Sequence, residues 1–105
     1  IGGSMETGSY LLLGTETSHQ ETFASTAHGS GRIMSRTKAK RLFRGEKLFR
    51  YMLNLGIYVQ SVSYSGLAEE AGEAYKYIDE VVKATVEAKI SKRVTRFVPI
   101  GNVKG

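Results

Sequence analysis

Thr26-Ala27-His28-Gly29-Ser30-Gly31-Arg32 is the stretch around which this chain is organised, because it combines an imidazole, two glycines, a hydroxyl and an arginine. The two glycines let the main chain approach a ligand closely and adopt positive φ angles. Successive N–H groups in such a turn form a concavity that binds anions. The imidazole of His28 is suited to act as a nucleophile, a general base or a metal ligand. The stretch therefore predicts a reactive histidine beside a phosphate-binding turn.

Two side chains within the stretch fit the same prediction. If a helix starts near Ser30, its free N–H groups attract an anion, and Ser30 serves as the helix cap or as a phosphate ligand. Arg32 offers a planar fork that matches phosphate geometry. The alternative is an ordinary Gly-x-Gly turn that follows a surface or core histidine. These residues alone leave both interpretations open.

The length and composition limit the chain to one modest domain. It has 105 residues and no cysteine, so it can form neither a disulfide nor a thiolate metal site. The apolar run Leu11–Leu13 is far too short to cross a membrane, and no secretory signal pattern opens the chain. We therefore expect a soluble cytoplasmic protein with no membrane partner.

The net charge of +5 is unevenly distributed along the chain. Residues 32–50 hold eight basic side chains against Glu46 alone, and residues 69–80 hold five acidic side chains against Lys76. A basic block directly after a phosphate-type turn indicates a polyanionic partner, nucleic acid before membrane. The alternative is a solvated helix face that the acidic block balances, and charge alone does not choose between the two.

Hydrophobic spacing predicts an α+β fold of short strands with about three helices. The predicted strands are 9–14, 57–62 and 93–98, and the predicted helices are 30–43, 46–55 and 73–90. Within the first helical range, Ser35 could cap a new helix after a break. Residues 15–20 are polar and predict a loop, whereas Phe23 is the expected apolar anchor of the segment that follows.

Two residues in the second half of the chain have open roles. Tyr75 falls in the first turn of the predicted helix 73–90, where it either packs against the core or presents its ring to a base. Lys104 lies between a valine and the last glycine, a position typical of a frayed, solvated lysine.

Several short motifs, each present once, follow one another along the chain. They are Gly3-Ser4-Met5, Ser9-Tyr10, Ala27-His28-Gly29-Ser30-Gly31-Arg32, Met34-Ser35-Arg36, Ala68-Glu69-Glu70-Ala71, Ala74-Tyr75-Lys76 with Ile78-Asp79, Pro99-Ile100-Gly101 and Val103-Lys104-Gly105. In this order and spacing they resemble the RtcB family of RNA ligases. The resemblance identifies residues 1–105 as one C-terminal segment, the nucleotide-binding and guanylylated-histidine part of a larger RtcB-type fold.

The resemblance implies a definite reaction. Family members join RNA with a 2′,3′-cyclic phosphate or 3′-phosphate end to RNA with a 5′-hydroxyl end, in tRNA splicing and RNA repair. They use GTP and Mn²⁺, and the position of His28 carries the covalent guanylate. His28 would attack the α-phosphorus of GTP, the RNA 3′-phosphate would take the GMP, and the 5′-hydroxyl would displace it. A neutral imidazole suits such a transfer because it is nucleophilic near neutral pH.

The resemblance also assigns the other site residues. The nucleotide-binding positions would be Gly2, Gly3, Ser4, Met5, Ser9, His28, Gly29, Ser30, Gly31, Tyr75 and Lys104. Tyr75 would pack on the guanine ring, and Lys104 would donate to the O6 acceptor of guanine. Arg32 and Arg36, four residues apart and so on one face of a helix, would hold the RNA 3′-phosphate.

Three positions depart from the family pattern. Gly2 stands where the family often has proline, Glu6 stands where glycine is usual, and Gly72 replaces a proline. Glu6 would oppose a bound anion if its side chain pointed into the nucleotide loop. None of the three departures touches the proposed nucleophile.

The family's Mn²⁺ ligands, including a cysteine and several histidines, lie upstream of the matched segment, and His19 is not one of them by position. We therefore expect that the chain alone holds no catalytic metal and does not ligate. We also expect apolar surface to be exposed where the missing N-terminal portion packs. The expected partners are tRNA halves, that missing portion and an activating accessory protein. Two other classes stay open: a basic RNA-binding module without catalysis, and a structural fragment that needs a partner chain.

Overall fold

Helices and short strands alternate along the chain, and the computed structural model describes all residues from 1 to 105. The elements in order are β1 (Ser9–Gly14), α1 (Glu16–Thr22), α2 (Arg36–Leu42), α3 (Gly45–Asn54), β2 (Tyr58–Ser61), α4 (Tyr64–Glu69), the 3₁₀ helix η1 (Gly72–Ala74), α5 (Ile78–Glu87), β3 (Ser91–Phe97) and β4 (Gly101–Lys104). The mixed α+β class is confirmed. The α-helices number five rather than about three, because the two short helices α1 and α4 were not among the predicted ones.

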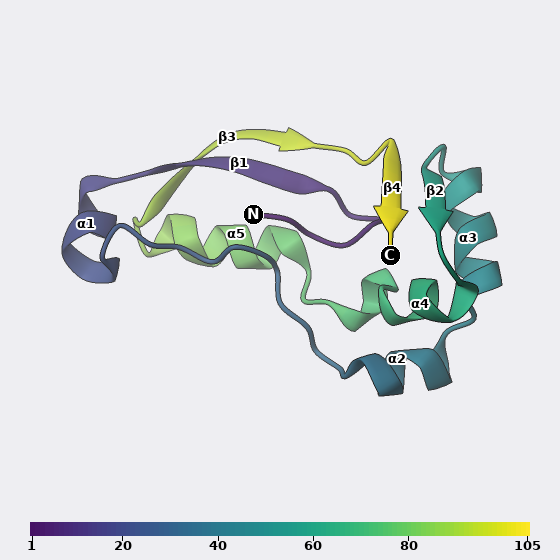
Figure 1. The fold of residues 1–105 in the computed structure, drawn as a ribbon. Coiled ribbons are helices and arrows are strands. Elements are labelled where there is room, and N and C mark those ends of the chain that lie inside the picture. Colours follow the sequence, from purple (N-terminus) through teal and green to yellow (C-terminus); the bar gives the residue numbers. More distant parts are fainter.

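The four strands form two separate two-stranded sheets (Figure 1). β1 and β3 pair antiparallel along the length of α5, with a bulge between Leu11 and Leu12. β2 and β4 pair in parallel at the other end of the molecule, where Ser61 lies opposite Lys104. Strand pairing therefore holds Lys104, and the expectation of a frayed terminal lysine is wrong.

A small apolar core lies where α3, α4 and β2 meet. It consists of Met5, Met52, Ile57, Val59 and Leu67, with Leu48 and Phe49 packed against it. The close approach of α3 to α4 depends on Gly45, because a Cβ there would overlap the main chain of Tyr64. Met5 brings the opening segment of the chain into this core, so the first residues are anchored to the helical end.

Much of the remaining apolar surface is exposed. Only 17 of 105 residues are buried. Large apolar side chains such as those of Leu13, Phe97 and Ile100 are more than half exposed. The radius of gyration is 15.3 Å, whereas a compact domain of this length has about 13 Å. The exposed apolar surface predicted from the sequence is present. No helix has the length and apolar character needed to cross a membrane.

Two predicted helices begin later than the sequence indicates. The range 30–43 contains only α2, which starts at Arg36. Ser35 is its N-cap, and the Ser35 hydroxyl accepts the Lys38 N–H at 3.1 Å. The range 73–90 contains α5, which starts at Ile78. Tyr75 is therefore not in a helical turn. It lies in an extended segment because residues 74–76 pair with residues 31–33 through main-chain hydrogen bonds of 2.9 Å.

The segment after β1 also differs from its prediction. Residues 16–22 form the helix α1 instead of a loop, because the Thr15 hydroxyl caps it by accepting the Ser18 N–H at 3.2 Å. Its surface is polar on almost every side, so it lacks the apolar stripe by which helices are recognised. Phe23 does not anchor this segment: it ends α1 in the left-handed region at φ 55° and is 94% exposed.

Candidate functional site

Gly2 joins the two glycine-containing segments that the sequence predicted to share a site. It pairs in antiparallel fashion with Ser9 on one side and in parallel fashion with Gly29 on the other. Its carbonyl oxygen accepts the Ser30 N–H at 2.9 Å. Four predicted nucleotide-binding residues therefore lie side by side, although they come from three separate stretches of the chain.

The opening segment uses its own N–H groups to build its loop. The N–H of Gly3 donates to the Gly8 carbonyl oxygen at 2.9 Å, and the N–H of Ser4 donates to the Thr7 hydroxyl at 2.9 Å. The Met5 side chain lies in the core and is 3% exposed. In this conformation the opening segment acts as a scaffold, because the N–H groups of Gly3 and Ser4 are committed within the chain.

Residues 28–32, by contrast, keep free donors. The N–H groups of Gly29, Gly31 and Arg32 donate no hydrogen bond within the chain, and Gly31 has a positive φ of 75°. The His28 side chain is exposed and has no hydrogen-bond partner in the chain. Ser30 is 4% exposed, and its hydroxyl is buried without a partner. No helix begins at Ser30, so anion attraction here rests on the turn itself.

Arg32 leads from this turn into a polar cluster. Its guanidinium donates to the carbonyl oxygens of Met34 at 3.1 Å and Glu69 at 2.6 Å, and to the Tyr75 hydroxyl at 2.9 Å. Arg36 makes no comparable hydrogen bond and is 67% exposed. The two arginines do not share a helix face, since only Arg36 lies in α2. In this conformation Arg32 is held by three hydrogen bonds, whereas Arg36 makes only longer ion contacts with Glu69 and Glu70 and stays exposed to solvent.

The carboxylates of Glu69 and Glu70 form ion pairs with several basic side chains. Glu69 pairs with Lys40 and, at 3.7 Å, with Arg36. Glu70 lies 3.7 Å from Lys104 and 3.6 Å from Arg32. The Lys40 ammonium holds the pKa of Glu69 below its ordinary value. The acidic block therefore balances part of the basic block, as one of the two interpretations of the charge pattern proposed.

Other basic side chains in the block 32–50 remain unbalanced. Arg50 pairs with Glu46 at 2.7 Å within α3. Those that form no ion pair are Lys38, Arg41, Arg44 and Lys47. They leave a net positive surface on α2 and α3, so the polyanion interpretation keeps a structural basis.

Tyr75 lies at the centre of the cluster. Its hydroxyl donates to Glu70 Oε2 at 2.6 Å. The Arg32 guanidinium carbon lies 4.7 Å from the ring centroid and covers one ring face. Burial raises the pKa of Tyr75, and the hydrogen bond to Glu70 raises it further. The ring is thus fixed in orientation, with one face already occupied.

Two of the departures from the family pattern meet in space. The Glu6 carboxylate lies against Gly72, where a Cβ would overlap it. Burial raises the pKa of Glu6, the Gly72 N–H lowers it, and the Glu73 carboxylate raises it. The Glu6 carboxylate is therefore held beside Gly72.

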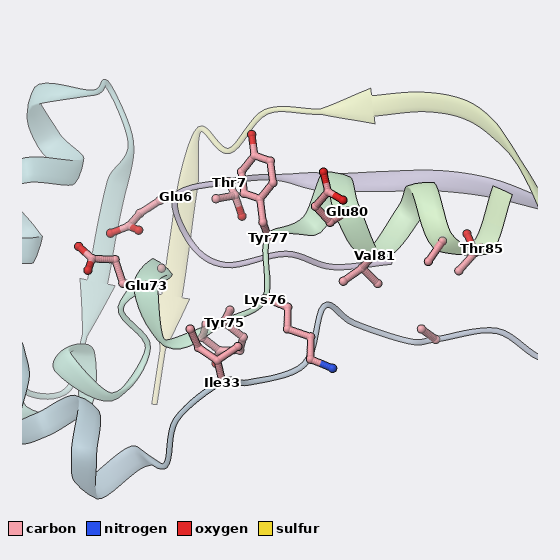
Figure 2. A pocket seen from close by; sticks show the side chains of 13 residues that line it. Glu6, Thr7, Ile33, Glu73, Tyr75, Lys76, Tyr77, Glu80, Val81 and Thr85 are labelled. Atoms are coloured by element: carbon pink, nitrogen blue, oxygen red, sulfur yellow. The ribbon is translucent and has the colours of Figure 1, made fainter. Parts of the chain in front are cut away.

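The largest pocket is lined by Tyr75 but by none of residues 28–32. It has a volume of about 1090 Å³ and lies between α5 and the segment carrying Ala27 and Ile33. Figure 2 shows the side chains that line it, among them the carboxylates of Glu6, Glu73 and Glu80. These carboxylates repel phosphate, so we do not assign the phosphate groups of a nucleotide to this pocket.

The predicted site residues fall into two groups joined by Gly31 and Arg32. One group surrounds Gly2 and His28, and the other surrounds Tyr75 and Lys104. Sequence reasoning placed Glu70 in a motif but gave it no role in the site. The acidic block, whose charge opposes that of the basic block, was a signal that Glu70 pairs with basic residues. Asn102 was also missed: its side-chain amide donates to the Met5 carbonyl oxygen at 3.1 Å and ties β4 to the opening segment.

The fold and site define a mixed α/β segment that has a turn with free main-chain N–H groups beside an exposed histidine. Over residues 1–105 the chain matches the family model described as tRNA-splicing ligase RtcB. It is 52% identical to the tRNA-splicing ligase RtcB of Pyrococcus horikoshii, 54% to that of Methanopyrus kandleri and 52% to that of Archaeoglobus fulgidus. Each comparison covers the whole chain, which spans 12%, 11% and 22% of those relatives respectively. The chain belongs to the RtcB family, and the resemblance predicted from its motifs is confirmed.

Proposed function

We propose that this chain is the C-terminal, nucleotide-binding part of a GTP- and Mn²⁺-dependent RNA ligase, in which His28 carries the guanylate. The observation that supports it most is the pairing of Gly2 with Ser9 and Gly29 beside an exposed His28. This pairing gathers residues that no single stretch of sequence contains. The ligase joins RNA 2′,3′-cyclic phosphate or 3′-phosphate ends to 5′-hydroxyl ends, with tRNA halves as substrates.

The proposed reaction consists of three successive displacements, each with its own leaving group. An imidazole nitrogen of His28 attacks the α-phosphorus of GTP, so that a P–N bond forms and pyrophosphate leaves. An oxygen of the RNA 3′-phosphate then attacks the same phosphorus and releases the histidine. The 5′-hydroxyl of the second RNA finally attacks the activated 3′-phosphate and releases GMP. A cyclic end enters this sequence after water has opened it to the 3′-phosphate.

Residues of this chain supply orientation and charge for these transfers. The N–H groups of Gly29 and Gly31 donate no hydrogen bond within the chain and would be available to a phosphate bound next to His28. Such donors stabilise charge that develops on phosphoryl oxygens. The exposed guanidinium of Arg36 suits the RNA 3′-phosphate. His28 lacks an orienting partner within the chain, so the proposal assigns that partner to the upstream portion of the ligase.

The proposed Mn²⁺ does not fit the residues of this chain. No group of three or more His, Cys, Asp or Glu side chains in it could hold a metal ion. We therefore place the Mn²⁺ ligands in the upstream portion, where the metal would screen phosphate charge. The other proposed partner is an accessory protein that assists turnover.

The test uses a chimeric ligase, in which this chain replaces the matching residues of the Archaeoglobus fulgidus relative. The chimeric ligase is incubated with Mn²⁺ and GTP labelled at the α-phosphorus. We expect an acid-labile label on the protein, because a phosphoramidate is hydrolysed in acid. His28→Ala should abolish the label, and His19→Ala should retain it because His19 lies on α1, outside the site. A label that survives His28→Ala would remove the assignment of the nucleophile.

A second candidate is an RNA-binding module without catalysis. The observation that favours it is the unpaired charge of Lys38, Arg41, Arg44 and Lys47 on α2 and α3. It predicts RNA binding that weakens steeply with salt and does not depend on GTP. Binding of this kind by a chimeric ligase that never becomes labelled would favour the module over the enzyme.

A further inference from the structure

One carboxylate oxygen connects the two residues that the proposed function places around guanine. Glu70 Oε2 accepts the Tyr75 hydroxyl at 2.6 Å and lies 3.7 Å from Lys104 Nζ. The Glu70 side chain is 19% exposed, so water screens these contacts only partly. Glu70 follows α4, Tyr75 precedes α5 and Lys104 lies in β4. A single side chain thus links three elements that are distant in sequence.

The neighbouring Glu69 has a different set of contacts. Its carboxylate pairs with Lys40 and Arg36 of α2, and it contacts neither Tyr75 nor Lys104. Its side chain is 22% exposed, close to the 19% of Glu70. The two residues are therefore matched in charge, exposure and position at the end of α4, and both lie near Arg36, at 3.7 Å and 3.9 Å respectively. They differ in that only Glu70 also contacts Tyr75 and Lys104.

We propose that Glu70 is a positioning residue that sets the base specificity of the nucleotide site by holding Tyr75 and Lys104. The inference rests on the proposed function, because it takes these two residues to contact guanine. A lysine has a flexible stem, and an unrestrained ammonium discriminates poorly between bases. Held by Glu70, Lys104 offers a donor that suits guanine O6, whereas adenine presents its own donor at the same ring position.

Glu70 also orients the ring of Tyr75. The Arg32 guanidinium covers one ring face, 4.7 Å from the centroid, and the hydroxyl is held by both Arg32 and Glu70. Because Arg32 and Glu70 both hold the hydroxyl, they fix the orientation of the ring, and a base would stack on the face that Arg32 does not cover. The carboxylate therefore positions the hydrogen-bonding side and the stacking side of the guanine pocket together.

The experiment compares Glu70→Gln with the matched control Glu69→Gln in the chimeric ligase. The measured quantities are KM and kcat of protein labelling by GTP, and the ratio of kcat/KM for GTP and ATP. For Glu70→Gln we expect KM for GTP to rise about tenfold and the GTP preference to fall about tenfold, with a smaller change in kcat. Glu69→Gln should leave the labelling constants within about twofold, since its contacts lie on α2.

Tyr75→Phe provides a second variant that removes only the hydroxyl held by Glu70. It should weaken GTP binding while Lys104 keeps its carboxylate, so the GTP preference falls less than in Glu70→Gln. Unchanged GTP preference in Glu70→Gln overturns the inference, as do equal effects of the two glutamate variants. Absence of label in the unmodified chimeric ligase speaks against the proposed function instead, so the two failures are distinguishable.

Discussion

The main-chain N–H of Ser30 donates to the carbonyl oxygen of Gly2 at 2.9 Å, although 27 residues separate them. This bond aligns the opening segment with residues 28–32 and leaves the N–H groups of Gly29 and Gly31 free. The opening segment thus supports the turn, and the turn offers the donors. That division of roles leads to the first prediction.

Gly3→Ala should destabilise the opening loop by about 1–3 kcal/mol, because overpacking a close contact forces the backbone to move. A Cβ at Gly3 would lie 2.5 Å from the Gly8 carbonyl oxygen. Gly2→Ala is the control, since no atom lies within 4 Å of its added Cβ. Hydrogen exchange of peptides covering residues 1–10 in the chimeric ligase measures the difference. Equal protection in both variants would contradict the prediction.

Gly72→Ala should lower stability through its contact with Glu6. The added Cβ overlaps the Glu6 carboxylate, which must leave its half-buried position. We expect a cost of about 1–3 kcal/mol in the wild-type background and less than half of that in Glu6→Ala. A double-mutant cycle of unfolding midpoints measures this coupling. Strict additivity of the two substitutions would show that the contact does not determine the cost.

The pKa of Tyr75 should fall toward its ordinary value in Glu70→Gln. Burial and the Glu70 carboxylate both disfavour the phenolate and raise the pKa. Because the folded-state pKa lies above the unfolded value, the associated stability is present below about pH 10 and is lost as the pH rises through the folded pKa. Ultraviolet titration of phenolate absorbance, with Tyr75→Phe subtracted to assign the signal, measures the shift. Glu69→Gln should leave the Tyr75 titration in place.

The isolated chain should bind an environment-sensitive hydrophobic dye and self-associate as its concentration rises. Leu13, Phe97, Ile100 and Val103 are all exposed, and such apolar surface favours association. Dye fluorescence and light scattering measure the two effects, with the chimeric ligase as the control expected to bind less dye per chain. A monodisperse isolated chain without dye binding would count against an apolar face that needs covering.

The elements that the sequence predicted well are those whose apolar residues decide the structure locally. β1 spans 9–14 as expected, and α3 has Leu48, Phe49 and Met52 on its packed side and Gly56 just beyond its end at φ 79°. The site residues were located by motif rather than by periodicity. Their roles in binding and catalysis remain predictions, but the pairing of Gly2 with Gly29 shows that the motifs meet.

The error at Tyr75 arose because distant segments compete with local propensity. The apolar and acidic pattern from Glu73 favours a helix, yet Tyr75 is extended because its neighbours bond to residues 31–33. Ala74 is fully buried as its pattern predicts, but it sits in η1. Tertiary main-chain pairing thus replaced the first turn of the expected helix.

By itself the sequence determined the family, the α+β class and the identity of the histidine and glycine residues in the turn, because these depend on local chemistry and on the order of motifs. Tertiary structure alone decided which amides stay free, that Arg32 is committed while Arg36 is exposed, and that Glu70 joins Tyr75 to Lys104. The physical reason is that hydrogen-bond donors and charges are distributed among partners by proximity in space. Such proximity is set when residues 29–30 pair with residue 2 and residues 31–33 pair with residues 74–76, far away along the chain.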